Sequence, residues 1–299
     1  MIDRTDVERA ADRIAGRVRR TPVLEVEDRR FGWPTFLKLE LLQHTGSFKP
    51  RGIFNRMLAA SVPEVGVIAA SGGNAGLAVA HAARELGHRA EIFVPESSPR
   101  LKVERLRTLG AEVTVTGAFY AEALDASAER AAETGALVVH AYDQPEVVAG
   151  QGTLACELAE QIPGLDTVLV AAGGGGLVAG IAAALEGRRC GVVAVEPVDV
   201  AVGGVAADSL GARRVGRICF AVATRTGIRS TLVPDEAIVS AQRMLWAEFR
   251  VVAEPGGAAA LAALLCGAYK PHPDERVGVV VCGANTDPAT VTGLSGSAK

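Results

Sequence analysis

Short apolar runs alternate with helical patterns through much of this chain, and this alternation constrains the fold more than any other feature. Apolar runs with helices between them are typical of strands buried on both faces of a parallel sheet. Glycines at 87, 110 and 135 close three of the helical segments. The chain is therefore predicted to be an α/β protein. The clearest strand runs are 66–70, 90–95, 112–116 and 137–141.

The spacing of these units predicts two domains. Short and uniform strand–helix units fill residues 61–143, whereas the flanking parts carry longer and less regular segments. We therefore expect a small α/β domain at 61–143, inserted into a large domain made of 1–60 and 144–299.

Two parts of the large domain lack a clear pattern. Residues 145–152 are predicted to be a crossing segment before a helix at 151–161. Residues 198–232 are rich in glycine, arginine and alanine and are predicted to be irregular.

Charge and cysteine content exclude several classes of protein. The 299 residues carry a formal net charge of −3, which gives no electrostatic case for binding nucleic acid or an anionic membrane. The apolar runs have the length of strands and are too short to cross a bilayer. The five cysteines form no Cys-x-x-Cys pair, and the N-terminus lacks an apolar export signal. We therefore expect a cytoplasmic protein without structural zinc.

A lysine stands at a junction between a loop and a helix. The stretch 46–52 reads Gly-Ser-Phe-Lys-Pro-Arg-Gly, and helical spacing of apolar residues follows at Ile53, Met57 and Leu58. The N-terminus of a helix disfavours an ammonium, so the pKa of Lys49 is expected to be lowered. A neutral lysine is the nucleophile that Schiff-base chemistry requires, although most lysines only cover protein surfaces.

Three glycine-bearing loops follow strands, where ligands bind in open α/β sheets. They lie at 71–76, at 173–176 and at Gly283. The loop at 173–176 has four consecutive glycines, and between a strand and a helix it can present backbone N–H groups to an anion. One or two glycines would suffice for a tight turn, so four indicate the close approach of a phosphate group.

A dinucleotide site is an alternative interpretation of this loop. Gly174-x-Gly176-x-x-Ala179 matches the loose fingerprint, and Glu196 ends the next strand where a ribose-binding acid would stand. No Gly-Lys-Ser/Thr follows the loop, so it is not a Walker A motif. The dinucleotide interpretation leaves the lysine and the other two glycine loops without roles.

Six short motifs occur in order along nearly the whole chain. They are Ser47-Phe48-Lys49-Pro50-Arg51-Gly52, Ser71-Gly72-Gly73-Asn74, Gly150-Gln151-Gly152-Thr153, Gly173-Gly174-Gly175-Gly176-Leu177, Glu254-Pro255 and Cys282-Gly283-Ala284-Asn285. Together they resemble the threonine/serine dehydratase and serine racemase family of fold-type II pyridoxal-phosphate enzymes. The resemblance implies the tryptophan synthase β-like fold, two parallel-sheet α/β domains with pyridoxal 5'-phosphate in the cleft between them.

The resemblance also implies a role for each matching residue. Lys49 would hold the cofactor as a Schiff base and act as the base at the substrate Cα, and Phe48 would pack beside the pyridine ring. Asn74 would bind the phenolic oxygen of the cofactor, and Cys282 stands where the family has Ser or Cys near the pyridine nitrogen. The phosphate would be held by the backbone amides of Gly173, Gly174, Gly175, Gly176 and Leu177, and the substrate carboxylate by Ser71, Gly72 and Gly73.

Two departures from the family pattern narrow the expected chemistry. Serine racemases of the family carry a second serine after the one at Ser71, which acts as a base on the opposite face of Cα, and this chain has Gly72 there. We therefore expect elimination and not racemisation. Some members bind a divalent cation with two acids; Glu196 matches the first, but the second position falls on Val202, so no metal site is expected.

The reaction implied is the β-elimination of a hydroxy amino acid, L-threonine or L-serine, to a 2-oxo acid and ammonia. The alternative is a serine racemase or a β-replacement synthase on the same scaffold. The chain ends soon after Asn285, so we expect no C-terminal regulatory domain. Because dimers are common in the family, we expect a homodimer that acts on a small amino acid.

Overall fold

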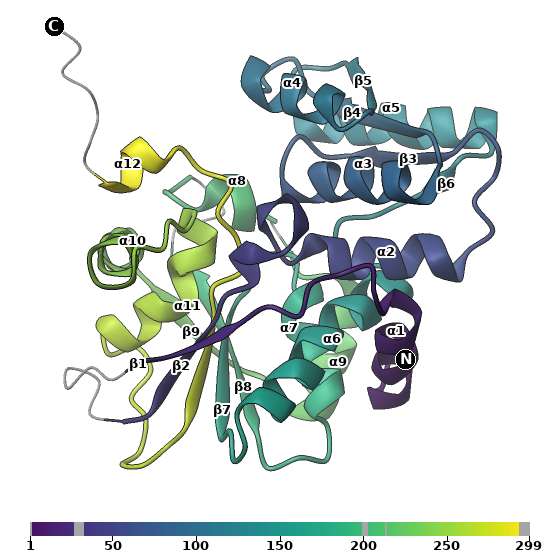
Figure 1. Ribbon diagram of the computed structural model, residues 1–299. Helices are drawn as coiled ribbons and strands as arrows, with labels where there is room; N and C mark the ends of the chain where they lie inside the picture. The colour runs from purple at the N-terminus through teal and green to yellow at the C-terminus, as the bar shows by residue number, and fades with distance from the viewer. Residues whose placement is uncertain (1, 27–32, 199–202, 213, 293–299) are drawn as a thin grey trace, which may run out of the picture.

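The strands form two separate sheets (Figure 1). The structure is a computed structural model, and it describes residues 2–26, 33–198, 203–212 and 214–292. The larger sheet has the order β1-β2-β10-β7-β8-β9 and is parallel except where β1 pairs with β2. Its strands are β1 (Val23–Val26), β2 (Thr35–Lys38), β7 (Thr167–Ala171), β8 (Gly191–Pro197), β9 (Arg229–Val233) and β10 (Val277–Val280).

The smaller sheet has the order β5-β4-β3-β6, and all of its pairs are parallel. Val67 and Ala69 of β3 (Val67–Ala70) pack into one apolar cluster together with α3 (Asn74–Leu86), whereas Ile68 and Ala70 pack into a second cluster together with α5 (Tyr120–Thr134). This alternation follows from the two-residue period of a strand, and it places helices on both faces. The strands are β3 (Val67–Ala70), β4 (Ala90–Val94), β5 (Glu112–Val115) and β6 (Leu137–Val138).

Helices cover both sheets, and α2 lies between them. Ile53, Phe54 and Met57 of α2 pack into the core of the smaller sheet, while the same helix also packs against α6 of the larger one. The helices are α1 (Arg4–Ile14), α2 (Lys49–Ala59), α3 (Asn74–Leu86), α4 (Arg100–Thr108), α5 (Tyr120–Thr134), α6 (Pro145–Gln161), α7 (Gly176–Leu185), α8 (Ala207–Leu210), α9 (Arg217–Thr226), α10 (Asp235–Phe249), α11 (Pro255–Leu265) and α12 (Pro288–Thr292), with short 3₁₀ turns η1 (Glu40–Leu42) and η2 (His44–Gly46).

Two sequence-based expectations about elements were wrong. The segment 145–152 is the first half of helix α6, which begins at Pro145. Glycines at 150 and 152 each disfavour a helix by about 1 kcal/mol, and close packing against neighbouring helices outweighs this cost. The described part of 198–232 contains α8, α9 and the start of β9. Among the described residues, no helix has the length and apolarity needed to span a membrane.

Candidate active site

Lys49 begins α2, and the loop before it is held against the loop that follows β10. Ser47 forms an isolated antiparallel bridge with Gly283. The Phe48 N–H donates to the Cys282 carbonyl at 3.1 Å. Lys49 and Cys282 therefore lie on adjoining loops although they are far apart in the sequence.

The Lys49 side chain is partly buried, and its amine has a neutral partner. Nζ donates to the Ala141 carbonyl at 2.7 Å and lies 5.0 Å from the centroid of the Phe48 ring. Burial lowers the pKa of Lys49 to about 8, while nearby Cys282 and Glu254 act in the opposite direction. The sequence predicts this direction, but burial and not the helix N-terminus is the main cause.

The four glycines form the turn between β7 and α7. Gly175 has φ of 84°, a conformation that residues with side chains rarely adopt. A Cβ on Gly174 would overlap the Tyr142 ring, and a Cβ on Gly176 would lie 2.7 Å from the Tyr142 carbonyl oxygen. The turn therefore tolerates no side chains at these positions. The N–H groups of the first turn of α7 have no partners within the helix, so they are suited to bind an anion.

The two other residues predicted to bind the phosphate belong to the same turn. A Cβ on Gly173 would lie 2.9 Å from the Leu210 backbone, at the end of α8. Leu177 stands in the first turn of α7 with a buried side chain, so only its backbone is available to a ligand.

Residues 141–142 bring the lysine and the glycine turn together. The Ala141 carbonyl accepts the hydrogen bond from Lys49, and the next residue, Tyr142, packs on Gly174 and Gly176. Adjacent Cα atoms are about 3.8 Å apart, so the amine and the turn are close enough to hold opposite ends of one small molecule. An amine suits an aldehyde and a turn of backbone N–H groups suits a phosphate, so these residues fit pyridoxal phosphate.

Asn74 begins α3, and its side chain connects the smaller sheet to the loop after β10. Its Nδ2 donates to Glu254 Oε1 at 2.6 Å, and its Oδ1 accepts from Asn285 Nδ2 at 2.6 Å. Asn285 Nδ2 also donates to the Thr45 carbonyl at 2.8 Å, just before the lysine loop. Glu254 is buried, and burial raises the pKa of its carboxyl. Asn74 therefore lies beside the same loops as Lys49.

Cys282 follows β10 and is buried. Its Sγ donates to the Gly256 carbonyl at 3.5 Å. Burial raises the pKa of the thiol well above its ordinary value, and nearby Glu254 acts in the same direction. Lys49 acts in the opposite direction but is outweighed, so the thiol is neutral at pH 7.

Ser71, Gly72 and Gly73 form the turn between β3 and α3, directly before Asn74. The Gly73 N–H donates to Ser71 Oγ at 3.3 Å, and open space lies beside Gly73. A Cβ on Gly72 would lie 3.4 Å from Ser98 Oγ, which is close to an ordinary contact distance. Packing therefore does not require glycine at position 72.

The sequence interpretation gave no role to four residues that the structure places at the site. Glu254 and Asn285 belong to two of the six motifs, so the sequence did single them out, but we predicted no function for either side chain. Ala141 contributes a backbone carbonyl, which no residue type can signal, and Tyr142 lies far in sequence from the glycines that it packs on.

Glu196 lies at the end of β8 and is partly buried, which raises the pKa of its carboxyl. Val202, the other position compared with the cation site of the family, lies outside the described residues. Within the part of the chain that the structure describes, no group of three or more His, Cys, Asp or Glu side chains could hold a metal ion.

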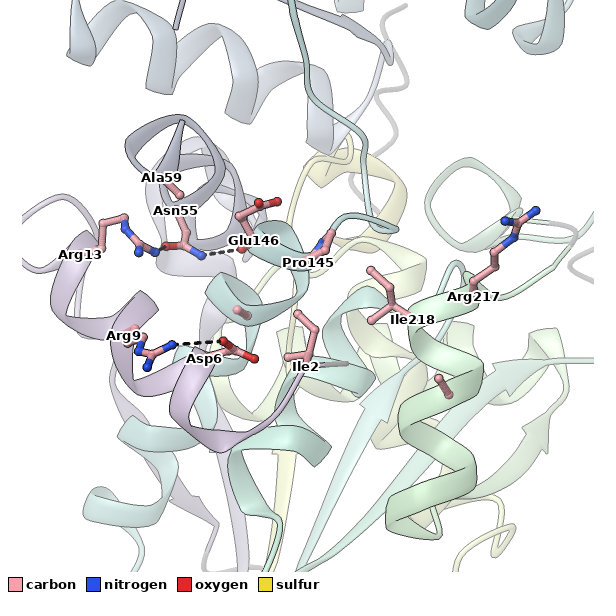
Figure 2. Close-up of a pocket in the computed structure, with 12 residues that line it drawn as sticks. Ile2, Asp6, Arg9, Arg13, Asn55, Ala59, Pro145, Glu146, Arg217 and Ile218 are labelled. Atoms are coloured by element: carbon pink, nitrogen blue, oxygen red, sulfur yellow. Dashed lines mark hydrogen bonds and ion pairs between the residues drawn. The ribbon is translucent and has the colours of Figure 1, made fainter. Parts of the chain in front are cut away.

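A separate cavity of about 560 Å³ lies between α1, α2, α6 and α9 (Figure 2). Arg13 donates to Asn55 Oδ1 at 2.5 Å on one wall, and Ile2, Pro145 and Ile218 contribute apolar surface. None of the residues predicted for the active site lines this cavity.

Comparison with known proteins decides the family. The family model described as "Pyridoxal-phosphate dependent enzyme" matches residues 14–283. The chain belongs to the pyridoxal-phosphate-dependent enzymes. Its cofactor is therefore pyridoxal phosphate, and the family match favours this over the dinucleotide alternative.

Relatives of this pyridoxal-phosphate enzyme include lyases and racemases. L-threonine ammonia-lyase of Geobacter sulfurreducens is 36% identical over 98% of this chain and 78% of the relative. Serine racemase of Oryza sativa subsp. japonica is 33% identical over 94% of this chain and 90% of the relative. The structure of maize serine racemase has a TM-score of 0.91 at 32% identity, covering 97% of this chain and 95% of that one. Threonine deaminase isoform 2 from Solanum lycopersicum has a TM-score of 0.88 at 29% identity, covering 98% and 87%.

We expect covalent attachment of the cofactor to follow the titration of Lys49. Only the neutral amine attacks an aldehyde, so attachment should speed up as pH rises, with a midpoint at about 8 in place of the ordinary lysine value of 10.5. Below the midpoint the rate should fall about tenfold per pH unit. Rapid-mixing absorbance of the apoenzyme with pyridoxal phosphate measures this rate. A midpoint at the ordinary lysine value would contradict the burial of the amine.

Proposed function

We propose that this enzyme catalyses β-elimination of L-threonine or L-serine to a 2-oxo acid and ammonia. The observation that carries the proposal is the meeting of the Lys49 amine and the glycine turn at residues 141–142. Support comes from relatives named L-threonine ammonia-lyase over nearly the whole chain.

The proposed roles follow from the position and chemistry of each side chain. Lys49, with its lowered pKa, is neutral often enough to take the proton from the substrate Cα. Bound pyridoxal phosphate supplies the electron sink for the electrons left at Cα. The N–H groups of 173–177 would hold the phosphate, and Phe48 would pack beside the ring. Asn74 would donate to the phenolic oxygen, with Glu254 and Asn285 orienting its amide.

Cys282 favours elimination over reactions that need a long-lived carbanion. Beside the ring nitrogen, the neutral Cys282 thiol would not hold a proton there as a carboxylate would, so the electron sink that the cofactor supplies would be weaker. The electrons left at Cα then form a double bond to Cβ while the Cβ–O bond breaks, and the hydroxyl takes the electrons of that bond and a proton and leaves as water. The unsaturated amine that is released tautomerises to an imine, and water then hydrolyses its C=N bond to give ammonia and the 2-oxo acid.

The substrate carboxylate is assigned to the turn of Ser71, Gly72 and Gly73. This turn stands at the N-terminus of α3, where backbone N–H groups and the helix dipole favour an anion. Gly72 can transfer no proton to the opposite face of Cα, so D-serine should not form.

Serine racemase is the second candidate, because two relatives and the maize structure carry that name. Incubation of the wild-type enzyme with L-serine separates the two functions. We expect pyruvate and ammonia without accumulation of D-serine, and Gly72→Ser, which the packing accommodates, should raise the ratio of D-serine to pyruvate. Net D-serine comparable to pyruvate from the wild type would contradict elimination.

A substrate panel tests the proposed function directly. Ammonia release should be fastest with L-threonine or L-serine among β-hydroxy amino acids. Efficient turnover of O-acetylserine with sulfide would instead support the β-replacement synthase.

We also propose that residues 1–60 and 144–299 form the large domain and 61–143 the small one, because each part carries one of the two sheets.

The five cysteines are free, which supports a reducing cytoplasm. We also propose a homodimer, because dimers are common in the family, and sedimentation measures the oligomeric state. A small amino acid remains the proposed partner, with no role for nucleic acid or membrane.

A further inference from the structure

Helix α6 lies between the helix that begins at the lysine and the helix that begins at the glycine turn. α2 starts at Lys49, α7 starts at Gly176, and α6 packs against both (Figure 1). The first half of α6 carries the motif at 150–153, which has no role in binding or chemistry so far.

The crossing of α6 with α2 is a contact of backbone on backbone. A Cβ on Gly150 would lie 2.5 Å from the Arg51 carbonyl oxygen and 2.7 Å from Gly52 Cα. A Cβ on Gly52 would lie 2.5 Å from the Val147 carbonyl oxygen. A Cβ on Gly52 would also lie 2.5 Å from Gln151 Nε2, so the Gln151 amide takes part in this contact. Gly52 is about one helical turn from the start of α2.

The crossing of α6 with α7 is equally close. A Cβ on Gly152 would lie 2.5 Å from the Gly180 carbonyl oxygen, and a Cβ on Gly180 would lie 2.6 Å from the Gly152 nitrogen. Gly180 is about one turn from the start of α7. Residues two apart on a helix point roughly 200° apart, so Gly150 and Gly152 serve opposite faces of α6.

Buried charges fix α2 to α6 next to the first crossing. Arg51 is 1% exposed and donates to Glu157 Oε1 at 2.8 Å and to Thr153 Oγ1 at 3.2 Å, both on α6. The guanidinium also makes a two-point contact with buried Glu40, at 2.7 and 2.8 Å. Lys38 forms an ion pair with Glu157 at 2.5 Å, so the two carboxylates of the cluster are matched by two positive charges. Separating such a cluster would leave a buried charge unpaired, so α2 has little freedom to shift.

We propose that Gly150 and Gly152 are positioning residues, and that α6 sets the spacing between Lys49 and the phosphate-binding turn. The proposal rests on the proposed roles of Lys49 and of that turn. Attachment at two points strengthens binding only when the spacing of the two points matches the ligand. A Cβ on Gly150 or Gly152 forces the helices apart by several tenths of an ångström, because the nearest atom that it meets is in each case a backbone carbonyl oxygen.

Three ligands measured on the apoenzyme test this. Pyridoxal phosphate uses both anchors, pyridoxal lacks the phosphate and uses only the lysine, and pyridoxine phosphate lacks the aldehyde and uses only the turn. For Gly150→Ala and Gly152→Ala we expect the affinity for pyridoxal phosphate to fall by about tenfold to a hundredfold. The affinities for the two single-anchor ligands should change by less than about twofold, because each anchor stays intact.

Two controls separate spacing from general damage. Leu158→Ala leaves a cavity in α6 at a fully buried position away from both crossings, and it should lower stability without this selective loss. If neither glycine variant folds, Glu157→Gln keeps the shape while weakening the link between α2 and α6, and it should give a smaller loss with the same selectivity.

Equal losses for all three ligands, or unchanged binding of pyridoxal phosphate in every folded variant, would overturn the proposal. A wild-type apoenzyme that binds pyridoxal phosphate no better than pyridoxal would instead refute the proposed anchors themselves, and the spacing proposal with them.

Discussion

Replacing Lys49 by alanine is expected to lower turnover at least about a thousandfold. The substitution removes both the amine that attaches the cofactor and the base that faces the substrate Cα. Lys49→Arg should be similarly inactive, because a guanidinium keeps the positive charge but does not become neutral. The measurement is ammonia release together with the visible absorbance of covalently attached cofactor.

The other lysines have different surroundings from Lys49, so we expect the loss of turnover only when Lys49 is replaced. The chain has lysines at 38, 49, 102, 270 and 299. Lys38 is held by Glu157 at 2.5 Å and Lys102 by Asp208 at 2.8 Å, so both have carboxylate partners. Lys270 is exposed, and Lys270→Ala is a matched control that should keep activity. Substantial turnover by Lys49→Ala would place the chemistry elsewhere.

Replacing Gly174 by alanine is expected to weaken cofactor binding by about a hundredfold. The added Cβ would overlap the Tyr142 ring, so either the ring or the turn must move. Movement of Tyr142 would also disturb the neighbouring Ala141 carbonyl, which is the partner of Lys49. Equilibrium binding of pyridoxal phosphate and of pyridoxine phosphate measures the loss, and both should weaken because the phosphate site itself is changed.

Gly191 lies outside the site, and its replacement by alanine is the control for the Gly174→Ala variant. A Cβ on Gly191, at the start of β8, would meet its nearest neighbour, Arg229 Nη2, at 3.6 Å, an ordinary contact distance. Gly191→Ala should therefore bind the cofactor like the wild type. Normal phosphate binding by Gly174→Ala would show that the turn is tight for packing reasons alone.

The sequence predicts the parts of this molecule that depend on residue type. The four glycines at 173–176 are required because a Cβ on any of them would meet neighbouring atoms closely. This requirement can be recognised in the sequence because only glycine meets it. The strand–helix alternation predicts the parallel sheets because buried parallel strands must be apolar on both faces.

Features that depend on the backbone or on distant segments escape the sequence. The Ala141 carbonyl that accepts from Lys49 carries no residue-type signal. Helix α6 was predicted too short, because Gly150 and Gly152 disfavour a helix locally while tertiary packing favours it. The hydrogen bonds of Asn285 to Asn74 and Thr45 join segments that are remote in the sequence.

The central claim is that Lys49 holds the cofactor covalently. Reduction of the holoenzyme with borohydride would fix that bond, and peptide mass spectrometry would then locate the pyridoxyl group. The account predicts the label on the peptide that contains Lys49. A label on Lys38, Lys102, Lys270 or Lys299, or no label on any lysine, would contradict it.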